Sequence, residues 1–477
     1  MSMISLPFAA LTALVFLALR LCGQFVKDRE HKAAAGKWIL LAASFLFTAY
    51  ADYRFALVLA FLAGTTWFCG KRPGLRKLGI LAALLCLGYF KYSNFFIESI
   101  SGILGRKDPV VLKLLLPLGI SFYSFSAISY LADLSRGVLE PRSLPEVALY
   151  LSFFPKITSG PIQRSKDFFQ QTDAPRNVGW ESFCAGIQIY MVGLFKKIVL
   201  ADRLSVFVNQ VYGTPKAFDS LTILLAVLAY SLQIYFDFSG YSDMAVGAAR
   251  ILDIRLPQNF NLPYLSHNVT EFWKRWHITL SSWLQDYLYI PLGGNRKGVL
   301  RTYCNLIITM VLGGIWHGAS WTYVIWGLLH GGALVVHKLW SSFSRSLSKT
   351  HSVLSNTLSV MGTFFFVSLA WVFFRADSVS HALLILGRLF SFAPGVRQLY
   401  VWFFFALAVL CGSSGAAVFR ARGEVLPPNR RNVSKAVCIT PALDLSGVWQ
   451  LTLFFVFCGL ILGLAYTGGS PFIYGAY

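Results

Sequence analysis

Long apolar runs dominate this 477-residue sequence. A membrane-spanning helix needs about 20 consecutive apolar residues, or fewer where neighbouring helices bury it. The runs show no alternation with a period of two, so they predict helices and not a β-barrel. They lie at 4–22, 38–50, 54–69, 78–97, 111–131, 181–200, 220–237, 302–316, 320–340, 356–375, 397–418 and 444–466. We therefore expect an all-α polytopic membrane protein with roughly ten to twelve spans.

Charge is sparse and unevenly placed. Only 13% of residues are charged and 56% are hydrophobic, whereas soluble domains average about 25% charged residues. The net charge of +21 comes mostly from short segments between apolar runs, as the positive-inside rule describes, so we do not expect nucleic-acid binding. The eight cysteines are scattered singly, which predicts neither disulfides nor a metal site.

The basic segments also predict an orientation. Segments 23–37, 70–77 and 419–435 carry Lys and Arg and are expected in the cytoplasm. The first apolar run is too long for a signal-peptide core and is interpreted as a retained span. Both ends of the chain are then expected outside the cytoplasm. We expect a single membrane domain over 1–477, made of N-terminal helices (1–133), a core (134–340) and C-terminal helices with a tail (341–477).

Two segments differ from ordinary spans. Residues 134–170 mix polar, apolar and proline positions, which predicts short amphipathic helices at the cytoplasmic surface, broken at Pro155 and Gly160. Residues 268–298 begin with a helix-capping pattern, and Trp and Leu recur there at helical spacing up to Pro291. That spacing predicts one continuous helix. Because charged residues interrupt it, the helix is expected to line a cavity or to enter the bundle from the cytoplasmic surface.

Three histidines lie in or beside apolar sequence. His277 belongs to the amphipathic segment, His317 to "GIWHGASW", and His330 to the next apolar run. Intramembrane ionisable groups are costly and often functional, and imidazole exchanges protons near neutral pH. A hydrogen-bonded packing role is the alternative for each one.

Longer motifs resemble those of a known family. "FWKRWHITLSSWLQDYLYIPLGGNRKG" (272–298) and "MVLGGIWHGASWTYVIWGLLHG" (310–331) resemble the paired motifs of the membrane-bound O-acyltransferases (MBOAT), closest to the bacterial alginate O-acetylation branch. Further similar segments are "PLGISFYSFSAISYLAD" (117–133), "FFPKITSGPIQR" (153–164) and "YFDFSGYSDMAVGAARILDIRLPQNFNLPY" (235–264). The resemblance covers roughly 40 to 340.

The resemblance implies a tunnel through the membrane, with an acyl thioester entering from the cytoplasm and an acceptor hydroxyl from outside. The catalytic residue of the family corresponds to His317, which would act as a general base. Its second polar position corresponds to His277, which would orient the acceptor or polarise the acyl carbonyl. Small residues such as Gly313, Gly314 and Gly318 would leave room for substrate.

The resemblance further implies acetyl-coenzyme A or another acyl thioester as donor, with no bound cofactor and no metal. It also implies an extracytoplasmic SGNH-type acetyltransferase partner, polysaccharide machinery and the inner membrane of a bacterial cell.

Several further residues are candidates for binding substrate or carrying the acyl group, and most of them have an alternative structural role. Asp237, Tyr241, Trp316 and His330 are candidates for lining the substrate path, although Asp237 and Tyr241 fit a structural hydrogen-bond network equally well. Arg296 and Lys297 are candidates for binding a phosphorylated donor or, alternatively, are cytoplasmic anchoring charges. The ending "SPFIYGAY" resembles a motif found at the end of alginate-type enzymes, which makes Tyr474 a candidate acyl relay or an aromatic interface anchor.

Two other functions compete with polysaccharide O-acetylation. A D-alanyl transferase of teichoic acids would take its acyl group from a carrier protein. A transporter would explain the apolar composition, but not the paired histidine motifs.

Overall fold

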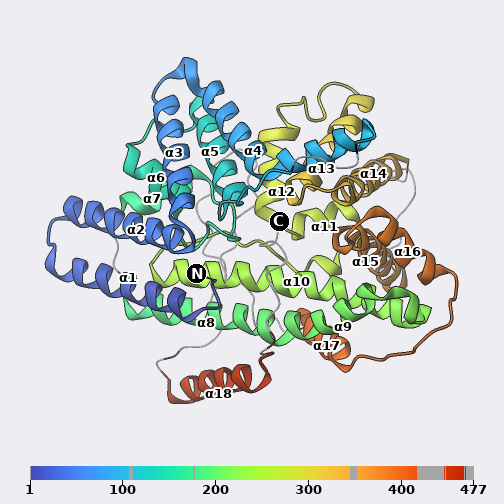
Figure 1. The fold of residues 1–477 in the computed structure, drawn as a ribbon. Helices are drawn as coiled ribbons and strands as arrows, with labels where there is room; N and C mark the ends of the chain where they lie inside the picture. Colours follow the sequence, from blue (N-terminus) through green and yellow to red (C-terminus); the bar gives the residue numbers. More distant parts are fainter. Residues whose placement is uncertain are drawn as a thin grey trace. The chain divides into compact units, whose positions relative to one another are not determined.

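The computed structural model describes residues 2–106, 111–175, 178–343, 352–415, 445, 447–466 and 468 (Figure 1). Over these residues the chain is helical and forms no strand, apart from an isolated bridge between Phe218 and Val396. The predicted all-α architecture is confirmed.

Eight helical stretches of the described chain are long and apolar enough to cross a membrane. They are Leu6–Phe25, Arg29–Ala51, Tyr53–Lys71, Pro73–Ile103, Trp180–Gly213, Ser220–Ile251, Val299–His317 and Val353–Arg375. Three apolar helices are shorter: Val379–Phe390, Val401–Cys411 and Val448–Leu464. This composition is that of a multi-pass membrane protein. One apolar run differs from expectation, because residues 111–119 are not helical and the helix begins only after Gly119, at φ 76°.

The chain packs as two compact units. The first comprises 1–193, 241–257 and 422–454. Its helices are α1 (Leu6–Phe25), α2 (Arg29–Ala51), α3 (Tyr53–Gly70), α4 (Arg76–Ile103), α5 (Ile120–Ser135), α6 (Leu144–Ser152), α7 (Ser165–Asp173) and α8 (Trp180–Leu194), with the short turn η1 (Pro73–Leu75).

In the first unit, capping residues define where helices α3 and α6 begin, and an ion pair connects α6 to α2. Asp52 ends α2 and starts α3, where its carboxylate accepts a hydrogen bond from Arg54 N. Ser143 and Glu146 form a capping box at the start of α6. Glu146 also accepts a hydrogen bond from Lys37 Nζ at 2.6 Å, which ties α6 to α2. The short helices predicted for 134–170 are confirmed as α6 and α7, separated by the turn that contains Pro155 and Gly160.

The second unit comprises 194–240, 258–421 and 455–477. Its elements are η2 (Phe195–Ala201), α9 (Asp202–Gly213), η3 (Pro215–Ala217), η4 (Pro263–Leu265), α11 (Val269–Arg275), α12 (Ile278–Leu284), η5 (Gln285–Tyr289), α13 (Val299–His317), α14 (Trp321–Phe343), α15 (Val353–Arg375), α16 (Val379–Phe390) and α17 (Val401–Gly415). Helices α10 (Ser220–Ile251) and α18 (Val448–Leu464) contribute several residues to each unit, and the last residue of α8, Leu194, belongs to the second unit.

Helices α13 and α14 pack backbone against backbone, and they run side by side in Figure 1. A Cβ atom on Gly314 would lie 2.3 Å from the carbonyl oxygen of Tyr323, and one on Gly327 would lie 2.6 Å from that of Met310. Gly331 approaches Ile307 in the same way. Small residues let membrane helices approach this closely. The close packing of α13 against α14 therefore fixes the position of the C-terminal end of α13.

Candidate active site

His317 is the last residue of α13, where Gly318 ends the helix with extended backbone. The side chain is 3% exposed. Its ring lies among aromatic rings, with centroid distances of 4.9 Å to Trp316, 5.3 Å to Trp326 and 5.2 Å to Phe374. Such a surrounding keeps bulk water away from the imidazole.

His277 lies at a break between two short helices, so the prediction of one continuous helix from residue 268 to Pro291 is wrong. Helix α11 ends at Arg275 and α12 begins at Ile278. Between them His277 adopts left-handed backbone with φ 42°, which is uncommon for a residue other than glycine. The strained turn points to a constraint imposed from elsewhere in the fold.

Asn259 supplies that constraint. Its Oδ1 accepts hydrogen bonds from Thr279 N at 3.2 Å and Thr279 Oγ1 at 2.9 Å, and lies 3.1 Å from Nδ1 of His277. The backbone donor identifies this atom as the amide oxygen, so Nδ1 must carry the proton of a neutral ring. His277 is fully buried, outside the eight candidate spans, and burial lowers its pKa to about 3.

The lone pair of His277 is therefore on Nε2, and no described residue forms a hydrogen bond to this atom. The ring centroids of His277 and His317 are 6.5 Å apart, and Trp316 lies 6.1 Å from His277. The structure thus brings together the two predicted histidines and Trp316, all within the second unit. The role of Asn259 was missed from the sequence, although the residue belongs to a motif quoted above.

His330 is on α14 and is fully buried. Its ring lies 4.8 Å from Trp326 and 5.2 Å from Trp273. Because Trp326 also contacts His317, the two histidines share one aromatic neighbour. Phe272, Phe366 and Trp371 complete the surrounding of His330.

Asp237 forms a buried ion cluster. Lys197 Nζ lies 2.6 Å from Asp237 and 2.7 Å from Asp202, and all three side chains are at most 2% exposed. Lys197 belongs to the π-helical turn η2, a rare form often found at functional sites. Of the two alternatives for Asp237, this geometry matches the structural network. Tyr241 lies in the first unit, where its hydroxyl is 3.5 Å from Ser2 Oγ.

The remaining candidates lie elsewhere in the chain. Arg296 and Lys297 are exposed on the loop before α13. Tyr474 lies outside the described residues, but the start of its tail is described. Arg203 donates hydrogen bonds to Leu464 O from Nη2 at 3.2 Å and from Nε at 3.3 Å, and Tyr466 N donates to Ile198 O at 3.1 Å. These bonds attach the end of α18 to η2 and α9.

The glycines around His317 do not leave open space, so that expectation is wrong. A Cβ atom on Gly318 would lie 2.1 Å from the Tyr323 ring, and one on Gly314 would meet the Tyr323 backbone. One on Gly313 would lie 3.2 Å from Leu284. Helix packing already uses the room that these glycines provide.

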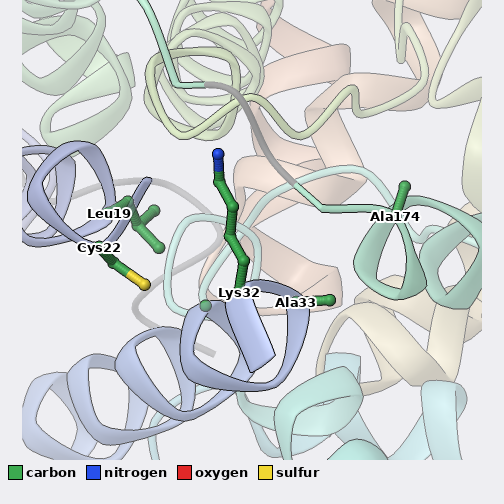
Figure 2. Close-up of a pocket in the computed structure, with 6 residues that line it drawn as sticks. Leu19, Cys22, Lys32, Ala33 and Ala174 are labelled. Atoms are coloured by element: carbon green, nitrogen blue, oxygen red, sulfur yellow. The ribbon is translucent and has the colours of Figure 1, made fainter. Parts of the chain in front are cut away.

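A small cavity in the first unit, drawn in Figure 2, carries no comparable chemistry. It is lined by Leu19, Cys22, Lys32, Ala33, Gly36 and Ala174. Lys32 is its one charged side chain, and its Nζ donates a hydrogen bond to Gly23 O at 3.2 Å. No acid–base pair is formed there. The described residues also contain no cluster of His, Cys, Asp and Glu suited to a metal ion.

The chain is similar to a known protein family and to several named proteins. The sequence profile of MBOAT, the membrane-bound O-acyltransferase family, matches residues 73–380. A probable alginate O-acetylase AlgI of Pseudomonas putida is 40% identical over 374 residues, which is 74% of each chain. A peptidoglycan O-acetyltransferase of Helicobacter pylori is 40% identical over 336 residues, or 65% of this chain and 63% of the relative.

A teichoic acid D-alanyltransferase of Streptococcus thermophilus is more distant. It is 31% identical over 277 residues, covering 54% of this chain and 66% of the relative. The family that we predicted from the sequence motifs is confirmed. Because this family consists of acyltransferases, the alternative of a non-enzymatic transporter is set aside. The chain belongs to the membrane-bound O-acyltransferase family.

Proposed function

We propose that this protein transfers acetyl groups from a cytoplasmic thioester to a hydroxyl group for O-acetylation of an extracytoplasmic polysaccharide. The observation that carries the proposal is the pair of buried rings of His277 and His317, 6.5 Å apart within an aromatic surrounding. The names of the 40% identical relatives, an alginate O-acetylase and a peptidoglycan O-acetyltransferase, support the acetyl group and the glycan.

His317 acts as the general base. As the acceptor oxygen attacks the thioester carbon, the imidazole takes the hydroxyl proton. The new C–O bond forms and the C–S bond breaks, and the departing thiolate recovers the proton from His317. General-base assistance of this kind is typically worth about 10²–10⁴-fold in rate. The enclosure by Trp316, Trp326 and Phe374 supports the mechanism because it limits hydrolysis of the thioester.

His277 orients the acceptor. With the proton on Nδ1, Nε2 can accept a hydrogen bond from a hydroxyl group but cannot donate one to the acyl carbonyl. The bond to Asn259 therefore favours orientation of the acceptor over polarisation of the carbonyl. Trp316 and His330 line the substrate path in this proposal, and Asp237 supports the helix that packs beside His277.

The donor is acetyl-coenzyme A or another acetyl thioester, used as a substrate. Arg296 and Lys297 are exposed on the loop before α13 and carry charges suited to its phosphates. The acceptor side involves an SGNH-type extracytoplasmic acetyltransferase and polysaccharide machinery. We place the protein in the inner membrane of a bacterial cell, as a single membrane domain over 1–477. Tyr474 relays the acetyl group on the outer side.

The test is donor turnover by the purified protein in detergent. Radiolabelled acetyl-coenzyme A should lose its acetyl group to an added acceptor, and His317→Ala should lose this activity while remaining folded. A D-alanyl carrier protein serves as the competing donor, because one family member is a teichoic acid D-alanyltransferase at 31% identity. If the protein used only the D-alanyl donor, its function would be D-alanyl transfer and not acetyl transfer.

A further inference from the structure

Lys156 in the first unit is a buried cation to which acyl transfer assigns no role. It lies in the turn between α6 and α7 and is 5% exposed. Within the described chain its Nζ forms no hydrogen bond, and no carboxylate lies within ion-pair distance of it. Its position is closely defined, because a Cβ atom on Gly160 would lie 2.5 Å from Lys156 Cα. The turn closes over this lysine only with glycine at position 160.

Two aromatic faces surround the ammonium group. Nζ lies 4.2 Å from the ring centroid of Tyr150 and 4.5 Å from that of Phe168. Aromatic faces attract a cation, but they offset only part of the cost of burying an unpaired charge. Burial lowers the pKa of Lys156 to about 7, so the charged form still needs a partner.

A small cavity lies between α5 and this turn. It is lined by Phe122, Tyr123, Ser126, Leu151, Lys156, Ile157, Pro161 and Ile162. None of these residues is acidic. Tyr123 is 1% exposed, and no described residue forms a hydrogen bond with its hydroxyl. The cavity therefore borders two residues whose buried polar groups have unused donor capacity.

The size of the cavity limits what it can hold. It has room for about one water-sized sphere. A water molecule could accept hydrogen bonds there but would not neutralise a charge. A phosphate or carboxylate group would have to displace the lining side chains. A halide ion is larger than a water molecule but is the smallest of these anions, so it needs only a small shift of the lining side chains, and it carries the required charge.

We propose that Lys156 is the cation of a binding site for a single halide ion, with the Tyr123 hydroxyl as a second donor. The site needs no acyl donor or acceptor, so it can be tested independently of the transferase activity. An ion that binds only the folded protein stabilises it by mass action, and the effect grows with ion concentration relative to Kd.

The experiment measures the thermal midpoint of the full chain in detergent, in sodium chloride or bromide against sodium gluconate at equal ionic strength. We expect a saturable rise of a few degrees in halide. Lys156→Met should abolish the rise, and Tyr123→Phe should weaken halide affinity several-fold. Lys166→Met, which removes a lysine charge from nearby α7, should retain the full response. Bromide should also give an anomalous scattering peak in the cavity.

Three results would overturn the site. Equal midpoints in halide and gluconate would mean that Lys156 is buried as a neutral amine. An unchanged halide response in Lys156→Met would place the ion elsewhere. Stabilisation by phosphate but not by halide would assign the cavity to a larger anion. Should Lys156→Met fail to fold, Tyr123→Phe and the position of the bromide peak decide the question.

Discussion

Nδ1 of His277 lies 3.1 Å from Oδ1 of Asn259, and this oxygen also accepts two hydrogen bonds from Thr279. One amide thus determines both the turn between α11 and α12 and the tautomer of a buried imidazole. In the proposed mechanism Asn259 is a positioning residue, because it would act on the reaction through His277.

Replacing Asn259 should therefore impair catalysis more than folding. Asn259→Ala should lower acyl transfer about 10–100-fold, as loss of a residue that orients a functional histidine commonly does. Asn259→Asp keeps an acceptor and should recover part of the rate. Steady-state kinetics with a labelled acyl donor would show the loss mainly in kcat. The exposed Asn261→Ala serves as the control. Equal activity of Asn259→Ala and wild type would mean that the tautomer of His277 has no influence on transfer.

Substitution of either histidine of the paired motifs should impair acyl transfer, whereas substitution of a histidine outside these motifs should not. His317→Ala removes the proposed base and should reduce acyl transfer about 10²–10⁴-fold without loss of folded protein. His277→Ala should also be severely impaired. His351→Ala, which changes a polar segment of the sequence outside the described residues, should be silent. Donor turnover and gel-filtration profiles of the three variants test this. Normal transfer by His277→Ala would leave that ring a structural role only.

The ion cluster of Lys197 should matter for stability. Lys197→Met leaves Asp202 and Asp237 buried without their shared ammonium group. Breaking a buried ion pair by removing one partner costs about 3–5 kcal/mol, so the thermal midpoint should fall sharply. Changing both carboxylates to amides in the Lys197→Met background should restore much of it. A midpoint unchanged by Lys197→Met would show that solvent or other groups compensate the two carboxylates.

Membrane orientation can be measured with single cysteines in a cysteine-free background. A cysteine at Lys71 or Arg72, or at Arg430 or Arg431 outside the described residues, should be protected from an impermeant thiol reagent in intact cells. One at Gly468 should be labelled. This pattern follows from the distribution of basic segments. Labelling of all three sites would contradict the assignment of the two basic segments to the cytoplasm, and a protected cysteine at Gly468 would contradict the placement of the C-terminal tail outside.

Tyr474 should be needed for acylation of the glycan but not for donor binding. A phenol with a pKa near 10 is a weak nucleophile on its own, so His317 or His277 would have to accept its proton. The phenyl ester formed there is more reactive than an alkyl ester, which suits a temporary carrier. Tyr474→Phe should therefore block glycan acylation while donor binding persists, and Tyr477→Phe should have little effect. A normal rate of glycan acylation in Tyr474→Phe would mean that the tail serves only as an aromatic anchor at the membrane interface.

The helices were predictable because apolar length is a local property of the sequence. The runs at 302–316 and 356–375 match α13 and α15 to within a few residues. Helix α10 extends well beyond the predicted 220–237, because its polar residues are buried along with the apolar ones. The run at 111–131 was overestimated because Pro117 and Gly119 interrupt the backbone without changing its hydrophobicity.

The site was predictable only in part. The motifs predicted His277 and His317 as site residues, and the fold brings their rings within 6.5 Å of each other. The break at His277 was not predictable from the spacing of Trp and Leu, because that spacing continues through it. That break depends on Asn259, 18 residues earlier in the sequence. Lys197 and Asp237 likewise meet through folding, and neither charge indicates its partner in the linear sequence.

The close approach of α13 to α14 has a consequence for redesign. Gly314 and Gly327 bring the two backbones together, so a larger residue does not fit at either position. The space around His317 therefore cannot be enlarged by changing these glycines. Trp326 and Phe374 meet the histidine through side chains alone. Engineering the enzyme to accept a bulkier acyl group should therefore begin with smaller residues at these two aromatic positions and leave the glycines untouched.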